Sequence, residues 1–423
     1  MLVRALYTLV LALVSPLLLW GLYRKRPNKP AIGKRWKEHW GFTPATSFNK
    51  PLWIHAVSVG EVLAVSPLIR ELKRQSPAQP IVLTTTTSTG AEQAEKLGDL
   101  VEHRYMPVDF SHCVRRFLAT VAPQALVIVE TELWPNTLHT VHQAGIPITV
   151  INARLSARSA KGYQRVKPLF NIIAKTVDQI LCLHQDDAHR FVQLGVSDNK
   201  VTVSGSIKYD LTISPNTIAE GNALRETLGS TRPVWIAAST HKGEDEKMLR
   251  IHRQVLAQYP DAILILVPRH PERFDDVAAL CLEEGFTAAR RSVNPSINSD
   301  TQIYLGDTMG ELLVMQQSAD ITVMGGSLIG DKVGGHNLLE PAALGKPSLI
   351  GPSFFNFTDV TLQLSDAGAT IIAQSEADIA SQLLELLQDT EKCDAMASTA
   401  KAVVKANQGA MAFTIERILK QVG

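Results

Sequence analysis

The hydrophobic and polar positions of the chain alternate in blocks that predict short buried strands, each followed by a polar turn and a helix. In the first half, the apolar blocks occupy residues 51–59, 81–87, 125–129, 148–151, 179–183 and 200–203. In the second half, they occupy residues 234–238, 262–267, 302–305, 321–324 and 347–350. Apolar strands that alternate with helices are typical of parallel, doubly wound sheets. The pattern therefore predicts an α/β fold built from two such series.

Polar residues follow several of these predicted strands, at the edge where doubly wound sheets bind their ligands. Glu61 follows the first block at a Gly-Glu turn into a helix, and its carboxylate is expected to project into the crevice. A general base needs that position and a partly dry setting, whereas a glutamate that only complements the helix dipole is the alternative. Glu130 and Glu132 follow the third block two positions apart, so their side chains are expected on the same side of the chain. Which of the two is functional is left open. His55 lies inside an apolar block and is interpreted as a core histidine.

The stretch 325–352 carries the clearest functional signal. Gly326 and Ser327 follow a short apolar strand, and glycines at such a turn let backbone amides approach a ligand. Asn337 precedes an apolar helical run that it can cap, and Glu340, one turn later, can accept hydrogen bonds from a ribose. This combination predicts a nucleotide, with its phosphate near the amides and its sugar on the carboxylate. An ordinary strand–helix–strand unit with tight turns is the alternative.

Two further turns of the second half have the chemistry of a nucleotide site. Arg269 and His270 come directly after an apolar block, where a fixed guanidinium can bind a phosphate bidentately. A solvated surface arginine is the alternative. The turn 308–311 opens a helix and offers free amides to a base or phosphate. The chain has no Walker A motif and no Asp-x-Asp motif for a metal-bound nucleotide. These features favour a metal-free glycosyltransferase with two Rossmann-like domains.

Composition is consistent with a two-domain globular enzyme. The 423 residues exceed one ordinary core, and 45% of them are hydrophobic while 20% are charged. A formal net charge of +1 argues against nucleic acid as a partner. Four widely separated cysteines form no metal-ligand pair and indicate a reducing compartment. We expect a first domain over 24–210, a linker over 211–232 and a second domain over 233–423, whose last helix can pack back onto the first domain.

Residues 1–23 are expected to form a membrane anchor. The segment 5–22 has no charged residue, although its 18 residues are near the lower limit for a bilayer span and Pro16 interrupts it. A cleaved signal peptide is the alternative, but here the positive charge lies mainly after the apolar run. The positive-inside rule then predicts a single-pass anchor in the cell inner membrane with cytoplasmic catalytic domains. Anionic lipid head groups are the expected partner of the basic and aromatic residues that follow, namely Arg24, Lys25, Arg26, Lys29, Lys34, Arg35, Trp36, Lys37 and Trp40.

A series of short motifs along the chain resembles those of a known family. They are HAVSVGE, TSTG, ETELWPN, NARLSARSAKGY, GSIKYD, ASTHKGE, LVPRHPERF, GDTMGEL and GGHNLLEPA, in this order. Together they resemble the Kdo transferases of lipopolysaccharide synthesis, which move 3-deoxy-D-manno-octulosonic acid (Kdo) from CMP-Kdo to the lipid A precursor, lipid IVA. The resemblance extends from the N-terminal anchor to about Gly409. The insertion IGDK before VGGHN is expected only to lengthen a loop.

The resemblance implies a GT-B fold, with two Rossmann-like domains that face a cleft, and an inverting reaction without metal. Glu61 is then the general base, and Glu130 and Lys208 match positions that stabilise the transition state. The positions that match CMP-binding residues are Arg269, His270, Met309, Gly310, Glu311, Asn337, Leu338, Leu339 and Glu340. CMP-Kdo is thus expected as the donor substrate, the lipid A precursor as the acceptor, and no cofactor or metal is expected.

Two other classes of function fit parts of the sequence. A nucleotide-sugar epimerase of the same fold would lack the anchor and release free sugar. A non-catalytic membrane scaffold would tolerate loss of Glu61 and bind no CMP. The number of Kdo residues transferred and the acyl pattern of the acceptor do not follow from the sequence.

Overall fold

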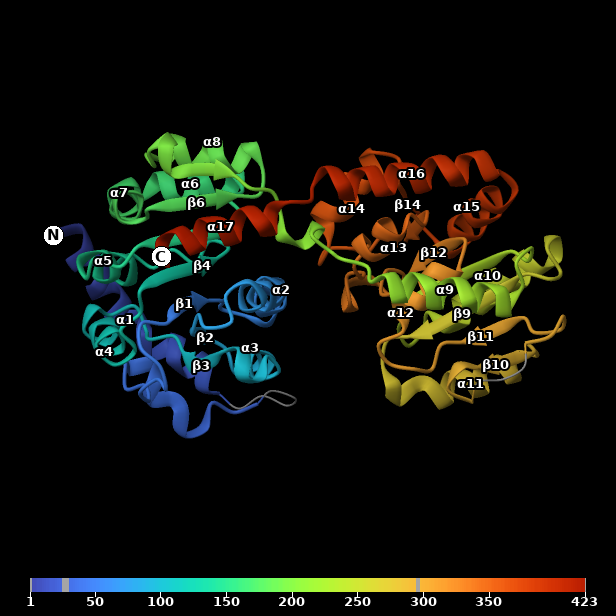
Figure 1. Ribbon diagram of the computed structural model, residues 1–423, viewed down its shortest axis with the longest axis horizontal. Helices are drawn as coiled ribbons and strands as arrows, with labels where there is room; N and C mark the ends of the chain where they lie inside the picture. Colours follow the sequence, from blue (N-terminus) through green and yellow to red (C-terminus); the bar gives the residue numbers. More distant parts are fainter. Residues whose placement is uncertain (1, 25–29, 294–296, 423) are drawn as a thin grey trace. The chain divides into compact units, whose positions relative to one another are not determined.

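The structure is a computed structural model that describes residues 2–24, 30–293 and 297–422. The chain divides into two compact units (Figure 1). The first comprises Met1–Asp210 together with Gln408–Gly423, and the second comprises Leu211–Asn407. The chain therefore leaves the first unit after Asp210 and returns to it at Gln408.

A seven-stranded parallel sheet forms the centre of the first unit, in the order β3-β2-β1-β4-β5-β6-β7. Its strands are β1 (Leu52–His55), β2 (Ile81–Thr85), β3 (Glu102–Tyr105), β4 (Ala125–Val129), β5 (Ile148–Ala153), β6 (Gln179–Cys182) and β7 (Val201–Val203). The strand order reverses between β1 and β4, and in open α/β sheets the ligand crevice lies at such a switch point. The turns that follow β1 and β4 are therefore where the fold places a ligand.

Helices complete the first unit around its sheet. They are α1 (Leu2–Tyr23), α2 (Val59–Gln75), α3 (Ser88–Glu95), α4 (Ser111–Val121), α5 (Pro135–Gln143), α6 (Ala157–Arg165), α7 (Lys167–Thr176), α8 (Gln185–Leu194) and α17 (Ala410–Val422), with the short 3-10 helices η1 (Gly33–Trp40), η2 (Gly98–Leu100), η3 (Asp198–Lys200) and η4 (Ile207–Tyr209). The C-terminal helix α17 belongs to this unit (Figure 1). Its residues Ile415 and Ile418 are buried in the same hydrophobic cluster as residues of β1, and the helix contacts α2 and β4.

The second unit is also built around a seven-stranded parallel sheet, in the order β10-β11-β9-β8-β12-β13-β14. Its strands are β8 (Val234–Thr240), β9 (Ile263–Pro268), β10 (Ala288–Arg290), β11 (Ile303–Leu305), β12 (Ile321–Met324), β13 (Ser348–Ile350) and β14 (Thr370–Ile372). Its helices are α9 (Pro215–Leu228), α10 (Asp245–Gln258), α11 (Phe274–Glu283), α12 (Leu312–Ser318), α13 (Leu339–Leu344), α14 (Thr358–Asp366), α15 (Glu376–Gln388) and α16 (Thr390–Ala406), with η5 (Pro271–Arg273), η6 (Arg291–Val293) and η7 (Gly330–Lys332). Here the switch point lies between β8 and β12.

The segment 211–232 is not a linker in this structure, which corrects the expectation from its proline and glycine residues. Most of it forms α9, which packs against α12 of the second unit. A Cβ on Gly221 would lie 2.4 Å from the Cβ of Gln317, so the glycine permits this close approach. Arg225 of α9 also pairs with Asp320 at 3.0 Å. Pro215 occupies the first turn of the helix, where proline is tolerated.

The N-terminal helix α1 is long and apolar enough to cross a membrane, judged by length and composition alone. Of the basic residues expected beside it, Lys25, Arg26 and Lys29 lie outside the described residues. Lys34 and Lys37 are exposed. Arg35 is instead bound within the first unit, because it pairs with Glu38 at 2.7 Å and its guanidinium lies over the ring of Tyr105. The expectation that Arg35 faces lipid is therefore wrong.

Candidate functional site

The switch point of the first unit holds a buried carboxylate. Glu61 lies in the first turn of α2, directly after β1, and is 7% exposed. Its oxygens accept hydrogen bonds from the amide of Val57 at 2.8 Å and from the hydroxyl of Ser58 at 3.0 Å. Burial raises the pKa of Glu61 to about 7, and the negative charges of Glu130 and Glu132 add to the increase. A carboxylate with this pKa can accept a proton near neutral pH, as a general base must.

Glu130 comes from the other side of the same switch point, directly after β4. It has φ +64, a left-handed conformation that non-glycine residues rarely adopt. Such backbone strain persists only where the surrounding structure imposes it, and it is common at functional sites. The amide of Glu130 donates a hydrogen bond to the carbonyl of Ile151 at 2.9 Å. Of the two carboxylates of this turn, Glu130 has the left-handed backbone and the larger effect on the pKa of Glu61.

Lys208 belongs to the same unit and lies in η4, a segment that contacts α2. Its side chain is exposed, and its ammonium group has no hydrogen-bond or ion-pair partner among the residues that the structure describes. The neighbouring Asp210 accepts hydrogen bonds from the amides of Gly409 and Met411 at 2.6 and 2.7 Å, which fixes the end of this segment. Lys208 is therefore an exposed ammonium group without a partner in the described part of the chain, on a turn whose end is fixed by hydrogen bonds.

His55 is a core residue, as predicted. It is 1% exposed, and its Nδ1 lies 3.0 Å from the hydroxyl of Thr84. Burial lowers the pKa of His55 to about 4, so the ring is neutral at physiological pH.

In the second unit, the Gly-Gly-Ser turn after β12 is bound to a buried glutamate that the sequence interpretation did not single out. Glu244 is fully buried, and its carboxylate accepts hydrogen bonds from the amides of Gly326 at 2.6 Å, Ser327 at 3.0 Å and Leu328 at 2.9 Å. A fourth bond comes from the amide of His241 at 3.0 Å. The expectation that the amides of Gly326 and Ser327 are free for a phosphate is therefore wrong, because an internal carboxylate already occupies them.

The glycines of this turn serve packing instead. A Cβ on Gly325 would lie 2.6 Å from the carbonyl oxygen of Ser239, and Gly326 has φ +71 beside the ring of His336. The hydroxyl of Ser327 donates to the carbonyl of Met324 at 2.7 Å and accepts from the amide of Gly351 at 2.9 Å. These contacts lock the turn between strands β8, β12 and β13.

Three histidines gather at the carboxyl ends of the strands in the second unit. The Nε2 atoms of His241 and His336 are 2.8 Å apart and their rings are stacked, while His270 meets His241 edge to face. Burial lowers the pKa of His336 to about 4, helped by the positive charges of His241, Arg269 and His270. One ring nitrogen must donate and the other accept, so at most one of the two rings can be protonated while this contact is made. The motifs ASTHKGE and GGHNLLEPA contain His241 and His336, but the sequence pattern indicates no role for either.

Arg269 and Glu340 belong to the same cluster. The positive charge of Arg269 lowers the pKa of Glu340, but burial raises it more strongly and determines its direction. Neither the guanidinium of Arg269 nor the carboxylate of Glu340 has a hydrogen-bond partner in the described part of the chain. Arg269 and Glu340 thus lie close enough for their charges to interact, and their roles toward a nucleotide stay predictions.

The turn into α13 is built partly as expected. The side chain of Asn337 accepts a hydrogen bond from the amide of Leu339 at 3.1 Å, which holds the helix start. Leu338 and Leu339 are 0% and 1% exposed. Their side chains are therefore core residues, and only their backbone can contribute to a ligand site.

In the predicted turn 308–311, the side chain of Met309 is exposed and the carboxylate of Glu311 already has an ion-pair partner. Met309 is 62% exposed, and Gly310 has φ +85. The carboxylate of Glu311 pairs with Arg291 at 2.7 Å, and this hydrogen bond is the main reason why the pKa of Glu311 is lowered. A side-chain contact from Glu311 to a ligand would have to compete with that ion pair.

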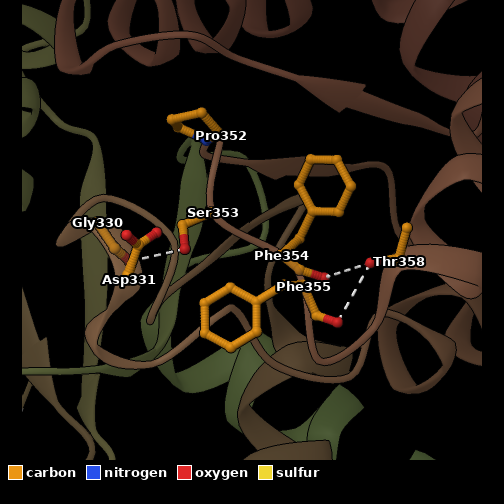
Figure 2. Close-up of a pocket in the computed structure, with 7 residues that line it drawn as sticks. All are labelled: Gly330, Asp331, Pro352, Ser353, Phe354, Phe355 and Thr358. Atoms are coloured by element: carbon orange, nitrogen blue, oxygen red, sulfur yellow. Dashed lines mark hydrogen bonds between the residues drawn. The ribbon is translucent and has the colours of Figure 1, made fainter.

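A separate hollow of about 360 Å³ lies beside the inserted segment IGDK. Figure 2 shows its lining of Gly330, Asp331, Pro352, Ser353, Phe354, Phe355 and Thr358. The hydroxyl of Ser353 donates to the carbonyl of Gly330 at 2.7 Å, so the insertion is fastened to this turn (Figure 2). None of the predicted site residues lines the hollow. Among the described residues, no group of three or more His, Cys, Asp or Glu side chains is placed to hold a metal ion.

Known proteins resemble this chain along almost its whole length. The family described as 3-deoxy-D-manno-octulosonic-acid transferase (kdotransferase) matches residues 34–211. A 3-deoxy-D-manno-octulosonic acid transferase of Haemophilus influenzae is 39% identical over 412 residues, which are 96% of this chain and 96% of that protein. The chain belongs to this transferase family. A second relative from Bordetella pertussis, of the same name, is 34% identical over 446 residues and covers 99% of this chain and 100% of its own.

A solved structure supports the fold. The UDP-GlcNAc 2-epimerase of Neisseria meningitidis, solved with UDP-GlcNAc, has a TM-score of 0.53 and covers 88% of this chain and 100% of its own. At 13% identity, this likeness concerns the fold alone. Together with the two parallel sheets, it confirms the predicted GT-B fold.

Proposed function

We propose that the protein transfers Kdo from CMP-Kdo to the lipid A precursor, lipid IVA, with inversion at the anomeric carbon and Glu61 as the general base. The proposal rests on membership of the transferase family and on one observation above all. Glu61 is a buried carboxylate at the switch point of the first unit, and its pKa is raised to about 7. A group of this kind can take the proton of an acceptor hydroxyl at neutral pH.

In the proposed reaction, an acceptor hydroxyl oxygen forms a bond to the anomeric carbon of Kdo as the bond from that carbon to the CMP phosphate breaks. The hydroxyl proton passes to Glu61, and CMP leaves with the electron pair of the broken bond. An oxocarbenium-like transition state needs positive charge near the leaving phosphate rather than an acid. Lys208 and Arg269 carry unpaired positive charges that suit this electrostatic role. One carboxylate base is then sufficient, unlike the carboxylate pair of glycosidases.

The second unit supplies the proposed donor contacts. Arg269 and His270 would hold the phosphate, and Glu340 would accept hydrogen bonds from the ribose. Asn337 would hold the helix start that carries Glu340. The backbone of 309–311 and of 338–339 would contribute to the nucleotide through amides and carbonyls. The amides of Gly326 and Ser327 have no part in this proposal, because Glu244 occupies them.

We place the enzyme at the inner membrane, held by α1, with both units in the cytoplasm. The exposed apolar residues of α1 support attachment to lipid, and a lipid acceptor explains why a soluble fold would carry such a helix. The exposed Lys34 and Lys37 after α1 suit anionic head groups.

Mass spectrometry of the products tests the proposal directly. Purified protein, CMP-Kdo and lipid IVA in detergent should give lipid IVA that carries at least one added Kdo, together with free CMP. Release of free Kdo without any lipid product would contradict a transferase role. Repeating the assay with Glu61→Gln shows whether the product depends on the proposed base.

A further inference from the structure

The helix α1 contacts the first unit through α5 and α7 and through residues near both of its ends. Its 22 residues span about 33 Å at 1.5 Å per residue. Partly buried positions recur mostly every three or four residues, which is one face of a helix. These positions are Arg4, Tyr7, Thr8, Leu11, Ser15, Leu19, Gly21, Leu22 and Tyr23. The contacts are made with α5 and α7, and near the end of the helix with Ile32, Ala91 and Tyr105.

Three hydroxyl-bearing side chains of α1, those of Tyr7, Thr8 and Tyr23, contact the rest of the first unit. The hydroxyl of Tyr7 donates to Asp109 at 2.9 Å, and the side-chain amide of Asn136 donates to the hydroxyl of Thr8 at 2.9 Å. At the other end, the hydroxyl of Tyr23 lies 3.1 Å from Nδ1 of His39. Both ends of the helix are therefore fixed to the same unit by polar contacts.

The contact at Asp109 is part of the fold of the unit. This carboxylate is 5% exposed and accepts further hydrogen bonds from the amides of Asn136 at 3.1 Å and Thr137 at 2.6 Å, at the start of α5. Removing Tyr7 would take a donor from a buried carboxylate, which is costly. A helix that crosses a bilayer is surrounded by lipid for about 20 residues. The helix α1 cannot cross a bilayer in that way and keep its contacts from Tyr7 to Tyr23.

The opposite face of α1 is apolar and exposed. It presents Leu2, Leu6, Leu9, Val10, Leu13, Val14, Leu17, Leu18 and Trp20, which are 41–86% exposed. An apolar surface of this extent marks an interaction site in a protein. The exposed Trp36, Lys34 and Lys37 lie in η1, whose residue Trp36 contacts Tyr23 at the end of α1. An uncharged face bordered by cations and tryptophan suits one leaflet of an anionic bilayer.

We propose that α1 lies in the plane of the membrane with its apolar face in a single leaflet, and that it does not span the bilayer. The inference deepens the membrane attachment that belongs to the proposed function. It replaces the single-pass topology expected from the hydropathy of the sequence. Both ends of α1, and both units, then remain on the cytoplasmic side.

Protease protection of the full-length protein tests the topology. A hydrophilic epitope tag is added before Met1, and protease is applied to intact spheroplasts and to lysed ones. An in-plane helix keeps the tag uncut until lysis. A spanning helix with cytoplasmic units places the tag outside, and cleavage in intact spheroplasts would overturn the proposal. Transfer activity in detergent is measured on the same protein, so that a failure of the topology is distinguished from a failure of the proposed function.

Flotation with vesicles of phosphatidylglycerol and phosphatidylethanolamine tests the occupant of the apolar face. Leu13→Lys with Leu17→Lys should reduce vesicle binding at least tenfold. The matched control Leu282→Lys replaces a leucine of α11 that is 64% exposed, and it should bind vesicles like the parent. Unchanged flotation of the double variant, or a parent that forms a dimer and ignores vesicles, would overturn the proposal. Circular dichroism confirms that each variant is folded.

Discussion

Glu61 and Glu130 follow the neighbouring strands β1 and β4 at the switch point of the first sheet, and the charge of Glu130 raises the pKa of Glu61. Burial is the larger cause, and hydrogen bonds from Val57 and Ser58 oppose it. The two carboxylates come from turns more than sixty residues apart in sequence, brought together because β1 and β4 are neighbours. The arrangement raises the pKa of this carboxylate toward neutral pH.

Replacing Glu61 by glutamine keeps the size of the side chain but removes its ability to accept a proton. If Glu61 is the base, turnover should fall by about 10²–10⁴, the usual contribution of general base catalysis. Binding of CMP, measured by calorimetry, should stay within about twofold of wild type, because the proposed donor contacts lie in the second unit. Normal turnover would end the catalytic assignment of Glu61 and would make Glu130 the next candidate.

The raised pKa of Glu61 also predicts how stability depends on pH. The unfolded state loses this proton near pH 4.5, whereas the folded state keeps it until about pH 7. Between these values the folded state binds more protons, so the contribution to stability is complete below 4.5 and is lost as pH rises through 7. Glu61→Gln should therefore melt higher than wild type at pH 8 and close to it at pH 4. A lower melting temperature at pH 8 would contradict the burial that raises this pKa.

The buried histidines have the opposite dependence. Burial lowers the pKa of His336, His55 and His252 to about 4 each. The unfolded state binds more protons between pH 6.5 and 4, so the free energy of unfolding should decrease as pH falls through this window. Urea unfolding at pH 7 and pH 5 measures the slope. His336→Gln should flatten it, while His142→Gln, at an exposed position, should leave it unchanged.

The sequence predicted the strands whose apolar residues are buried on both faces. Blocks 125–129 and 321–324 coincide with β4 and β12. The strands that were missed are β3, β10 and β14, and each lies at the edge of its sheet. The edge strand β3 carries the polar residues Glu102–Tyr105, so hydropathy gives no signal for it, whereas the apolar edge strand β7 was predicted.

The sequence can place a single side chain that follows a strand or begins a helix. Glu61, Arg269 and Glu340 are predicted in this way, and their roles toward the substrates stay predictions. The turn around Gly326 was misjudged because its amides are bound by Glu244, which is 82 residues away in the chain. No local pattern reveals a partner at that separation. The stacked pair of His241 and His336 was missed for the same reason.

Glu340 is predicted to accept hydrogen bonds from the ribose hydroxyls of the donor. Glu340→Ala would leave ribose hydroxyls without a charged partner, a loss of about 1.5–3 kcal/mol. The affinity for CMP should fall about tenfold or more, since about 1.4 kcal/mol corresponds to a factor of ten. Calorimetry on this variant is compared with Glu283→Ala, which removes an exposed glutamate of α11. Equal affinity in the two variants would place the nucleotide elsewhere.

The proposed reaction should need no divalent ion, because Lys208 and Arg269 supply the positive charge. Transfer from CMP-Kdo should therefore continue after exhaustive treatment with EDTA and gel filtration. Loss of activity that returns with Mg²⁺ would show that the roles given to these two cations are wrong.

Glu244 is predicted to be a structural residue whose loss destabilises the second unit. Glu244→Ala would leave four amides without an acceptor, those of His241, Gly326, Ser327 and Leu328. A buried donor without a partner costs about 1–3 kcal/mol, so the loss should reach about 3 kcal/mol or more even after partial relaxation. Urea unfolding measures it against Glu226→Ala, an exposed glutamate of α9.

The same variant distinguishes two roles for the Gly-Gly-Ser turn. If the turn only supports the neighbouring histidines, CMP affinity should fall or stay unchanged when Glu244 is removed, because the freed amides lose their geometry. If the turn instead binds phosphate once Glu244 moves away, Glu244→Ala should bind CMP more tightly than wild type, since the competing carboxylate is gone. Calorimetry at a temperature where the variant is folded separates these outcomes. Tighter binding would restore Gly326 and Ser327 to the donor site.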